Sequence, residues 1–206
     1  MSKLEKELED AKEQLRQVIS SRKMDGYVSA HLTVLSLERK IAAERMDEYA
    51  ETIEFPVKWD IGAPMPHRLA NGHRTFLLFY LPDSYSEGSR TESIALAQFH
   101  QCVSSKLGDP NEDVLRFHLL YGKGLEPYTA QIVRNSKWVN ELEAINKMHP
   151  QYDQDFWRTL KHYILWFHDE TFECVAKSYE VEVFQKYEPT ESMNEMLIEA
   201  VKRLVS

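Results

Sequence analysis

Histidine and acidic side chains gather near the end of the chain, and these residue types are the ones from which a catalytic or metal site is built. If residues 161–168 form a strand, His162 and His168 point to the same face, because alternate strand residues share a side. Acidic residues follow at the predicted turn and just beyond it. The candidate ligand-binding residues are His100, His162, Trp166, His168, Asp169 and Glu173.

A transition metal is one chemistry that this set allows, since imidazole nitrogens, thiolates and carboxylates are its usual ligands. Cys102 shares a predicted strand face with His100 and could join them. His162 and His168, however, stand six residues apart on one strand, roughly 20 Å, so they could not bind one ion directly. The competing interpretation is half-buried histidines held by hydrogen bonds. No cofactor is therefore predicted, and a transition metal stays as the alternative.

Nucleophilic and acid–base chemistry are two further interpretations. Cys102 or Cys174 could act as a nucleophile activated by a histidine, and the acidic residues near the turn could act as general acid and base. Cys174 shares its predicted face with Phe172 and Ala176, which favours a core position. The sequence contains no glycine-rich phosphate loop, GxSxG, HExxH, EF-hand loop or paired CxxC. The common nucleotide and zinc enzymes are thereby excluded.

The first quarter of the chain has the pattern of two helices. Residues 3–22 carry apolar side chains at spacings of four and three, and Ser2 with Glu5 forms a capping-box start. Residues 27–52 repeat the helical period with a wider apolar arc, so this segment must touch both the first helix and either the body or a second copy. We predict a helical hairpin arm over residues 1–52. The stripe residues of the first helix are Leu4, Leu8, Ala11, Leu15 and Val18.

From residue 53 the apolar period shortens towards two, which predicts a sheet domain over residues 53–206. The expected fold class is α+β, with a mostly antiparallel sheet, one inserted helix capped by Ser136, and a C-terminal helix that begins at Ser192. Residues 83–92 are expected to form a loop. The expected strands are 54–61, 75–81, 93–103, 115–121, 128–133, 161–168 and 171–184.

Three segments of this sheet domain resemble proteins from bacteria. They are Phe167–Ala176, with the sequence FHDETFECVA, Tyr121–Tyr128 and Asn135–Trp138. On these segments the chain resembles a group of uncharacterised bacterial proteins over roughly residues 93–184. The resemblance implies one intact sheet domain and carries no activity or catalytic residue with it.

Charge and composition restrict the partners. The formal charge of −8, from 25 Lys and Arg against 33 Asp and Glu, repels a phosphate backbone, and no basic patch offsets it, so we expect no nucleic-acid binding. No stretch is long and apolar enough for a membrane helix, and residues 1–10 are charged where a signal peptide is apolar. The two cysteines lack a nearby partner, which is typical of reduced thiols. We expect a cytoplasmic protein without membrane contact.

The predicted function is that of a non-enzymatic interaction protein. The arm, through residues 3–50, would mediate homo-oligomer formation or partner binding, and the acidic sheet domain would serve as a recognition surface for a basic partner. The alternative is a small-molecule or metal-binding enzyme whose pocket gathers the histidines and acids near the last hairpin. Convergence of those side chains in one cleft would favour the enzyme.

Overall fold

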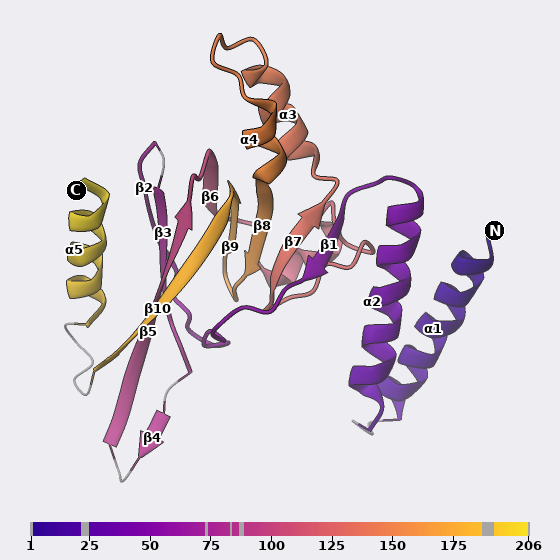
Figure 1. The fold of residues 1–206 in the computed structure, drawn as a ribbon. Coiled ribbons are helices and arrows are strands. Elements are labelled where there is room, and N and C mark those ends of the chain that lie inside the picture. Colours follow the sequence, from indigo (N-terminus) through magenta and orange to yellow (C-terminus); the bar gives the residue numbers. More distant parts are fainter. Residues whose placement is uncertain are drawn as a thin grey trace.

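The chain folds into a two-helix arm beside a body of two antiparallel sheets, and the architecture is α+β as predicted (Figure 1). The computed structural model describes residues 2–21, 25–72, 74–82, 84–86, 89–186 and 192–205. The helices are α1 (Lys3–Ser20), α2 (Tyr27–Glu44), the 3-10 helix η1 (Glu112–Phe117), α3 (Lys137–Asn146), α4 (Gln154–Thr159) and α5 (Ser192–Val205). The strands are β1 (Tyr49–Thr52), β2 (His67–Ala70), β3 (Arg74–Tyr80), β4 (Ser84–Ser86), β5 (Ser89–His100), β6 (Ser104–Gly108), β7 (Ala130–Arg134), β8 (Lys161–Trp166), β9 (Thr171–Ala176) and β10 (Ser178–Lys186).

Helices α1 and α2 form the predicted hairpin. The capping box at Ser2 is present: its hydroxyl accepts a hydrogen bond from the Glu5 backbone N–H at 3.2 Å, and the Glu5 carboxylate accepts from the Ser2 N–H at 2.5 Å. The apolar stripe of α1 packs on α2 around Ala11, Val34 and Leu37. The leucines of that stripe are only partly buried, because α2 covers α1 from one side alone.

The second helix is shorter than predicted. It ends at Glu44 instead of continuing to residue 52, and Met46 then adopts a left-handed φ of 55° that no helix continues through. Tyr49–Thr52 instead pair with β7 as an edge strand of the body. The switch from helix to strand therefore comes several residues before position 53.

The body contains two sheets where the sequence predicted one. The first has the order β1-β7-β8-β9-β6, the second β10-β5-β3-β2 with β4 beside β5, and all pairings are antiparallel. The chain passes between the sheets after His100 and again at Lys177, whose N–H donates to the His100 carbonyl oxygen at 3.0 Å. The predicted single strand over 171–184 is therefore wrong: it is β9 in one sheet and β10 in the other, because the chain bends at Lys177.

The main core lies between the sheets, and helices cover the outer faces. Alternate residues of the central strands point inward and form one cluster that includes Phe79, Phe99 and Phe172. Helix α5 covers the outer face of the second sheet through Met196 and Ala200. The outer face of the first sheet is covered by α3 and α4 at one end and by the segment 112–125 at the other.

Three strand or loop expectations fail for identifiable reasons. Residues 54–61 form no strand; the segment instead places Trp59 in the core between the sheets. The expected strand 115–121 is the end of η1 followed by turns, which place Leu120 over Trp166 on the outer face of the first sheet. The expected loop at 83–92 contains β4 and the start of β5, with residues 83 and 87–88 outside the described chain.

No helix in the described ranges has both the length and the apolarity that a membrane crossing requires.

Phe99 tests the importance of the core between the sheets. Its ring lies 5.1 Å from the ring of Phe172 and 5.7 Å from that of Tyr163, and it is fully buried. We expect Phe99→Ala to lower the free energy of unfolding by about 3–5 kcal/mol, measured by urea denaturation, because it leaves a cavity. The matched change Phe117→Ala, at a side chain that is 76% exposed, should cost under about 0.5 kcal/mol. Equal losses would contradict this account of the core.

Candidate functional site

Two of the six predicted site residues, His162 and Glu173, touch each other. They lie on the neighbouring strands β8 and β9, on the outer face of the first sheet, and His162 Nε2 is 2.8 Å from Glu173 Oε2. Both side chains are less than 10% exposed. A carboxylate buried this deeply requires charged or hydrogen-bonding partners.

Two residues that the sequence did not identify as site residues complete this network. Lys106 on β6 places Nζ 2.8 Å from Glu173 Oε1, and Ser136 places Oγ 2.9 Å from His162 Nδ1. The indole of Trp138 lies nearly perpendicular to the His162 ring, with 5.0 Å between the ring centres, and the Lys106 ammonium lies over the same indole at 5.1 Å. We call Ser136, His162, Glu173 and Lys106 the buried polar network.

The local structure explains how Ser136 reaches His162. Ser136 follows the end of β7 and the left-handed residue Asn135 (φ 53°), and it is the N-cap of α3, where its hydroxyl accepts from the Val139 N–H at 3.2 Å. β7 pairs with β8, so the end of β7 lies beside His162. The cap was predicted from the sequence, but its contact with His162 depends on strand pairing that the sequence does not reveal.

The network controls the protonation of Glu173. Burial alone raises the pKa of this carboxyl, but the hydrogen bonds and charges of His162 and Lys106 outweigh burial and lower the pKa to about 2. The carboxylate is therefore ionised at neutral pH.

A pocket of about 290 Å³ lies beside this network, and Ser136 and His162 form part of its wall. Trp157 and Leu160 add apolar surface, and three basic side chains stand around it. The basic residues are Arg134, Arg158 and Lys161.

His168 and Asp169 belong to a different cluster. His168 lies in the turn after β8; its Nδ1 is 2.8 Å from Asp169 and its Nε2 is 3.0 Å from Glu112. The hydrogen bond to Asp169 raises the pKa of His168, and the nearby Glu112 carboxylate adds to the effect. Among the described residues, these three are the group of ligand types close enough to hold a metal ion. Both imidazole nitrogens already contact carboxylates, as a protonated histidine prefers.

The remaining candidates lie elsewhere. His100, at the end of β5, is 3.3 Å from Glu180 on β10 and contacts Gln98. Trp166 is fully buried beneath the segment 112–125. The structure therefore does not bring all six residues into one pocket. His162, Trp166 and Glu173 lie on the outer face of the first sheet, whereas His168 and Asp169 lie in the turn after β8 and His100 lies on the second sheet.

The cysteines are core residues, as predicted for Cys174. Both thiols are free and lie in the cluster between the sheets. A hydrogen bond with Cys174 lowers the pKa of Cys102 to about 7, whereas burial raises the pKa of Cys174. Neither side chain is more than 4% exposed, and neither lines one of the described pockets.

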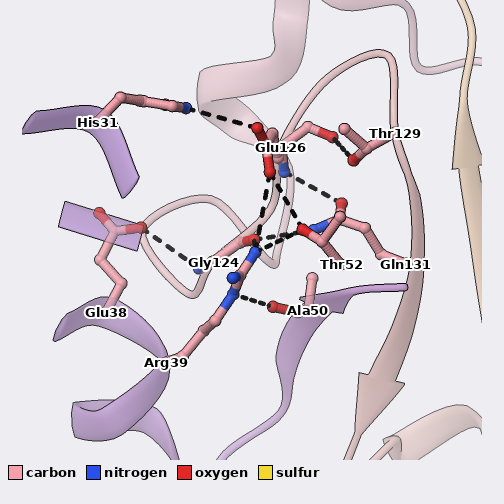
Figure 2. Close-up of polar contacts among 9 residues, drawn as sticks. All are labelled: His31, Glu38, Arg39, Ala50, Thr52, Gly124, Glu126, Thr129 and Gln131. Atoms are coloured by element: carbon pink, nitrogen blue, oxygen red, sulfur yellow. Dashed lines mark hydrogen bonds and ion pairs between the residues drawn. The ribbon is translucent and has the colours of Figure 1, made fainter. Parts of the chain in front are cut away.

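A second polar centre joins the arm to the body (Figure 2). Arg39 of α2 donates from Nε to the Ala50 carbonyl oxygen at 2.8 Å, and from Nη2 to Thr52 Oγ1 at 2.8 Å and the Gly124 carbonyl oxygen at 3.1 Å. Glu126 lies 4.0 Å from the same guanidinium. We call these contacts the Arg39 anchor, and they fix α2 against β1 and the 124–126 loop.

Glu38 and Gln131 reinforce the anchor. Glu38, 8% exposed, accepts the Gly124 N–H at 3.3 Å and lies 3.7 Å from Lys12 of α1, so one carboxylate links both helices to the loop. Gln131 donates to the Gly124 carbonyl oxygen at 2.9 Å and accepts from the Glu126 N–H at 3.1 Å (Figure 2). The arm is thus held by directed hydrogen bonds as well as by apolar packing.

The anchored arm presents an open groove of about 1040 Å³ between α1 and α2. Val28 and Leu32 on α2 line it and are 66% and 50% exposed. The small side chains Ser29, Thr33 and Ser36 lie along the same stretch of α2. This surface combines exposed apolar groups with small side chains that allow close approach of another helix.

Comparisons of this chain with models of protein families, with curated proteins and with solved structures gave no match. The resemblance to bacterial proteins therefore stays a prediction, and function is argued from the geometry alone.

Acid unfolding tests the ionisation of Glu173. Because its folded pKa lies below the ordinary value, the charged carboxylate stabilises the fold above about pH 4.5 and loses this effect as the pH falls towards about 2. We expect the difference in unfolding free energy between wild type and Glu173→Gln to shrink over that range, measured by urea titration. Glu141→Gln, at an exposed residue, is the control. A pH-independent difference would contradict the assignment.

Gly124 tests the Arg39 anchor. Its φ is +81°, and a Cβ atom there would lie 2.5 Å from Arg39 Cγ and 2.6 Å from the Ala50 carbonyl oxygen. We expect Gly124→Ala to destabilise the protein by about 1–3 kcal/mol in thermal or urea unfolding. Gly72→Ala, with open space around the added atom, should change stability by less than about 0.5 kcal/mol. Similar results for the two variants would contradict the close packing of the loop on Arg39.

Proposed function

We propose that the protein is an interaction protein whose helical arm joins two copies of the chain. The observation that carries this proposal is the self-complementary pattern of side chains along the exposed face of α2. Two pairs stand at equal distances on either side of a point between Leu32 and Thr33: Ser29 and Ser36 match in size, and Lys40 is opposite in charge to Asp25 in the turn before α2.

The pattern becomes explicit when a second α2 is laid antiparallel across the groove about a two-fold axis at that point. Residues whose numbers sum to 65 then face each other, and Lys40 meets Asp25 of the other copy. Ser36 meets Ser29 in the same arrangement, so small side chains let the helices approach. Neither Lys40 nor Asp25 forms an ion pair within the described part of the chain, so both are available to a partner.

A second copy suits this surface because a two-fold interface must be complementary to itself. Pairing two arms makes a four-helix arrangement, which buries the exposed Val28 and Leu32 and removes them from water. The Arg39 anchor supports this function by holding each α2 at one angle to its body, so that the arm docks as a preformed surface.

The body has the second role in the proposal. Its overall acidity favours a basic protein partner and disfavours nucleic acid. The free thiols of Cys102 and Cys174 agree with a reducing compartment, and we place the protein in the cytoplasm.

Sedimentation velocity of the full chain tests the self-association. We expect wild type to sediment with twice the 24.2 kDa mass of one chain, and Leu32→Glu to sediment as a single chain, because it buries a charge in the apolar contact. Ile19→Glu is the control, since Ile19 is also an exposed apolar residue of the arm but lies outside the groove.

Charge reversal tests the register. Lys40→Glu should weaken the dimer by several fold, and Lys40→Glu combined with Asp25→Lys should restore it. A single-chain mass for wild type at micromolar concentration, or a dimer that Leu32→Glu leaves intact, would refute the proposal.

A further inference from the structure

The buried polar network has the donor and acceptor order of a serine nucleophile site. We propose that Ser136 is the nucleophile of an ester-hydrolysing site, with His162 as its general base and Glu173 as the residue that orients the imidazole. This inference goes beyond the self-association of the arm and does not depend on it, because none of the three residues lies on α1 or α2.

The hydrogen bonds assign the roles. Glu173 is a carboxylate and can only accept, so His162 donates to it from Nε2–H across 2.8 Å. In its uncharged form, with the one proton on Nε2, the ring carries a free lone pair on Nδ1, 2.9 Å from Ser136 Oγ, which accepts the hydroxyl proton. Such sites are defined by geometry and roles and not by position in the chain.

The helix cap at Ser136 is compatible with attack. A hydroxyl oxygen has two lone pairs, and the Val139 N–H occupies one of them, so the second is available to a carbonyl carbon. The N-terminus of α3 also carries partial positive charge where an oxyanion would develop. Among the described contacts, the Trp138 N–H in this first turn has no hydrogen-bond partner and is available to that oxygen.

The adjacent pocket indicates the class of substrate. Its volume of about 290 Å³ fits a small molecule, and Trp157 and Leu160 offer an apolar contact. Three basic residues and one acidic residue, Glu143, line the pocket, and this excess of positive charge favours an anionic group on the substrate. Arg134 and Arg158 already pair with Glu51 and Asp155, whereas Lys161 forms no ion pair within the described chain. We therefore expect a small ester that carries a carboxylate or phosphate group near Lys161.

The reaction needs only the ester and water. Ser136 Oγ bonds to the acyl carbon while its proton moves to His162 Nδ1, and the bond from that carbon to the alcohol oxygen breaks as the alcohol takes the proton. Water then attacks the acyl-serine and gives its proton to His162, which returns a proton to Ser136 Oγ. The sum is ester plus water giving carboxylic acid plus alcohol, with no oxidation or reduction.

Covalent labelling of the full chain tests the nucleophile. Wild type is incubated with an alkyl fluorophosphonate, and the modified residue is located by peptide mass spectrometry. We expect an adduct on Ser136 that disappears in Ser136→Asn, because asparagine preserves the helix cap but has no hydroxyl. Ser2→Asn is the matched control, since Ser2 is also a helix cap but has no histidine partner in the structure, and its labelling should equal that of wild type.

The roles of the other two residues have separate readouts. His162→Gln should slow labelling by at least about 100-fold, while its circular dichroism spectrum matches that of wild type. Glu173→Gln should shift the pH midpoint of labelling downward, because the imidazolium loses its carboxylate partner; a purely structural role would leave the midpoint unchanged.

Substrate preference has its own assay. Wild type should hydrolyse p-nitrophenyl hemisuccinate faster than p-nitrophenyl acetate, and Lys161→Glu should reverse that preference.

The proposal is overturned if folded wild type gains no adduct on Ser136, or if His162→Gln is labelled as fast as wild type. Neither result depends on the mass of the particle in solution, so it would leave the dimer proposal standing.

Discussion

The hydrogen bonds of Arg39 to the carbonyl oxygens of Ala50 and Gly124 are the interaction on which the relation of arm to body depends. Those oxygens lie where β1 and the loop before β7 meet α2, and a buried carbonyl without a donor costs free energy. A guanidinium offers several donors in a fixed plane, so one side chain satisfies two backbone segments far apart in sequence. The glycine at 124 permits the close approach, and Glu38 ties the same loop to α1.

The protein has two surfaces with different chemistry, and they lie on different elements. The groove of the arm is lined only by α1, α2 and the turn between them, whereas the buried polar network belongs to β6, β8, β9 and the start of α3. A two-fold contact through α2 therefore leaves the pocket beside His162 open. The proposed self-association and the proposed ester hydrolysis can therefore be tested by separate substitutions.

Local patterns in the sequence predicted those parts of the fold that depend on neighbours along the chain. The capping box at Ser2, the alternation of faces along β8 and the cap at Ser136 all appear in the structure. The failures concern contacts across the chain. Residues 115–121 look apolar enough for a strand, but Leu120 is apolar because it covers Trp166 from a turn. The contact of Ser136 with His162 depends on pairing between β7 and β8, and that of Lys106 with Glu173 on pairing between β6 and β9, and no periodicity encodes strand pairing.

The most direct test of the central claim, that two arms pair in one antiparallel register, is disulfide trapping between different chains. One variant carries Ser29→Cys and another Ser36→Cys, both at exposed positions, and the native thiols are buried in the core. Under mild oxidation the account predicts a covalent heterodimer when the variants are mixed, formed much faster than a homodimer of either variant alone. Equal homodimer formation, or no covalent dimer in the mixture, would contradict it.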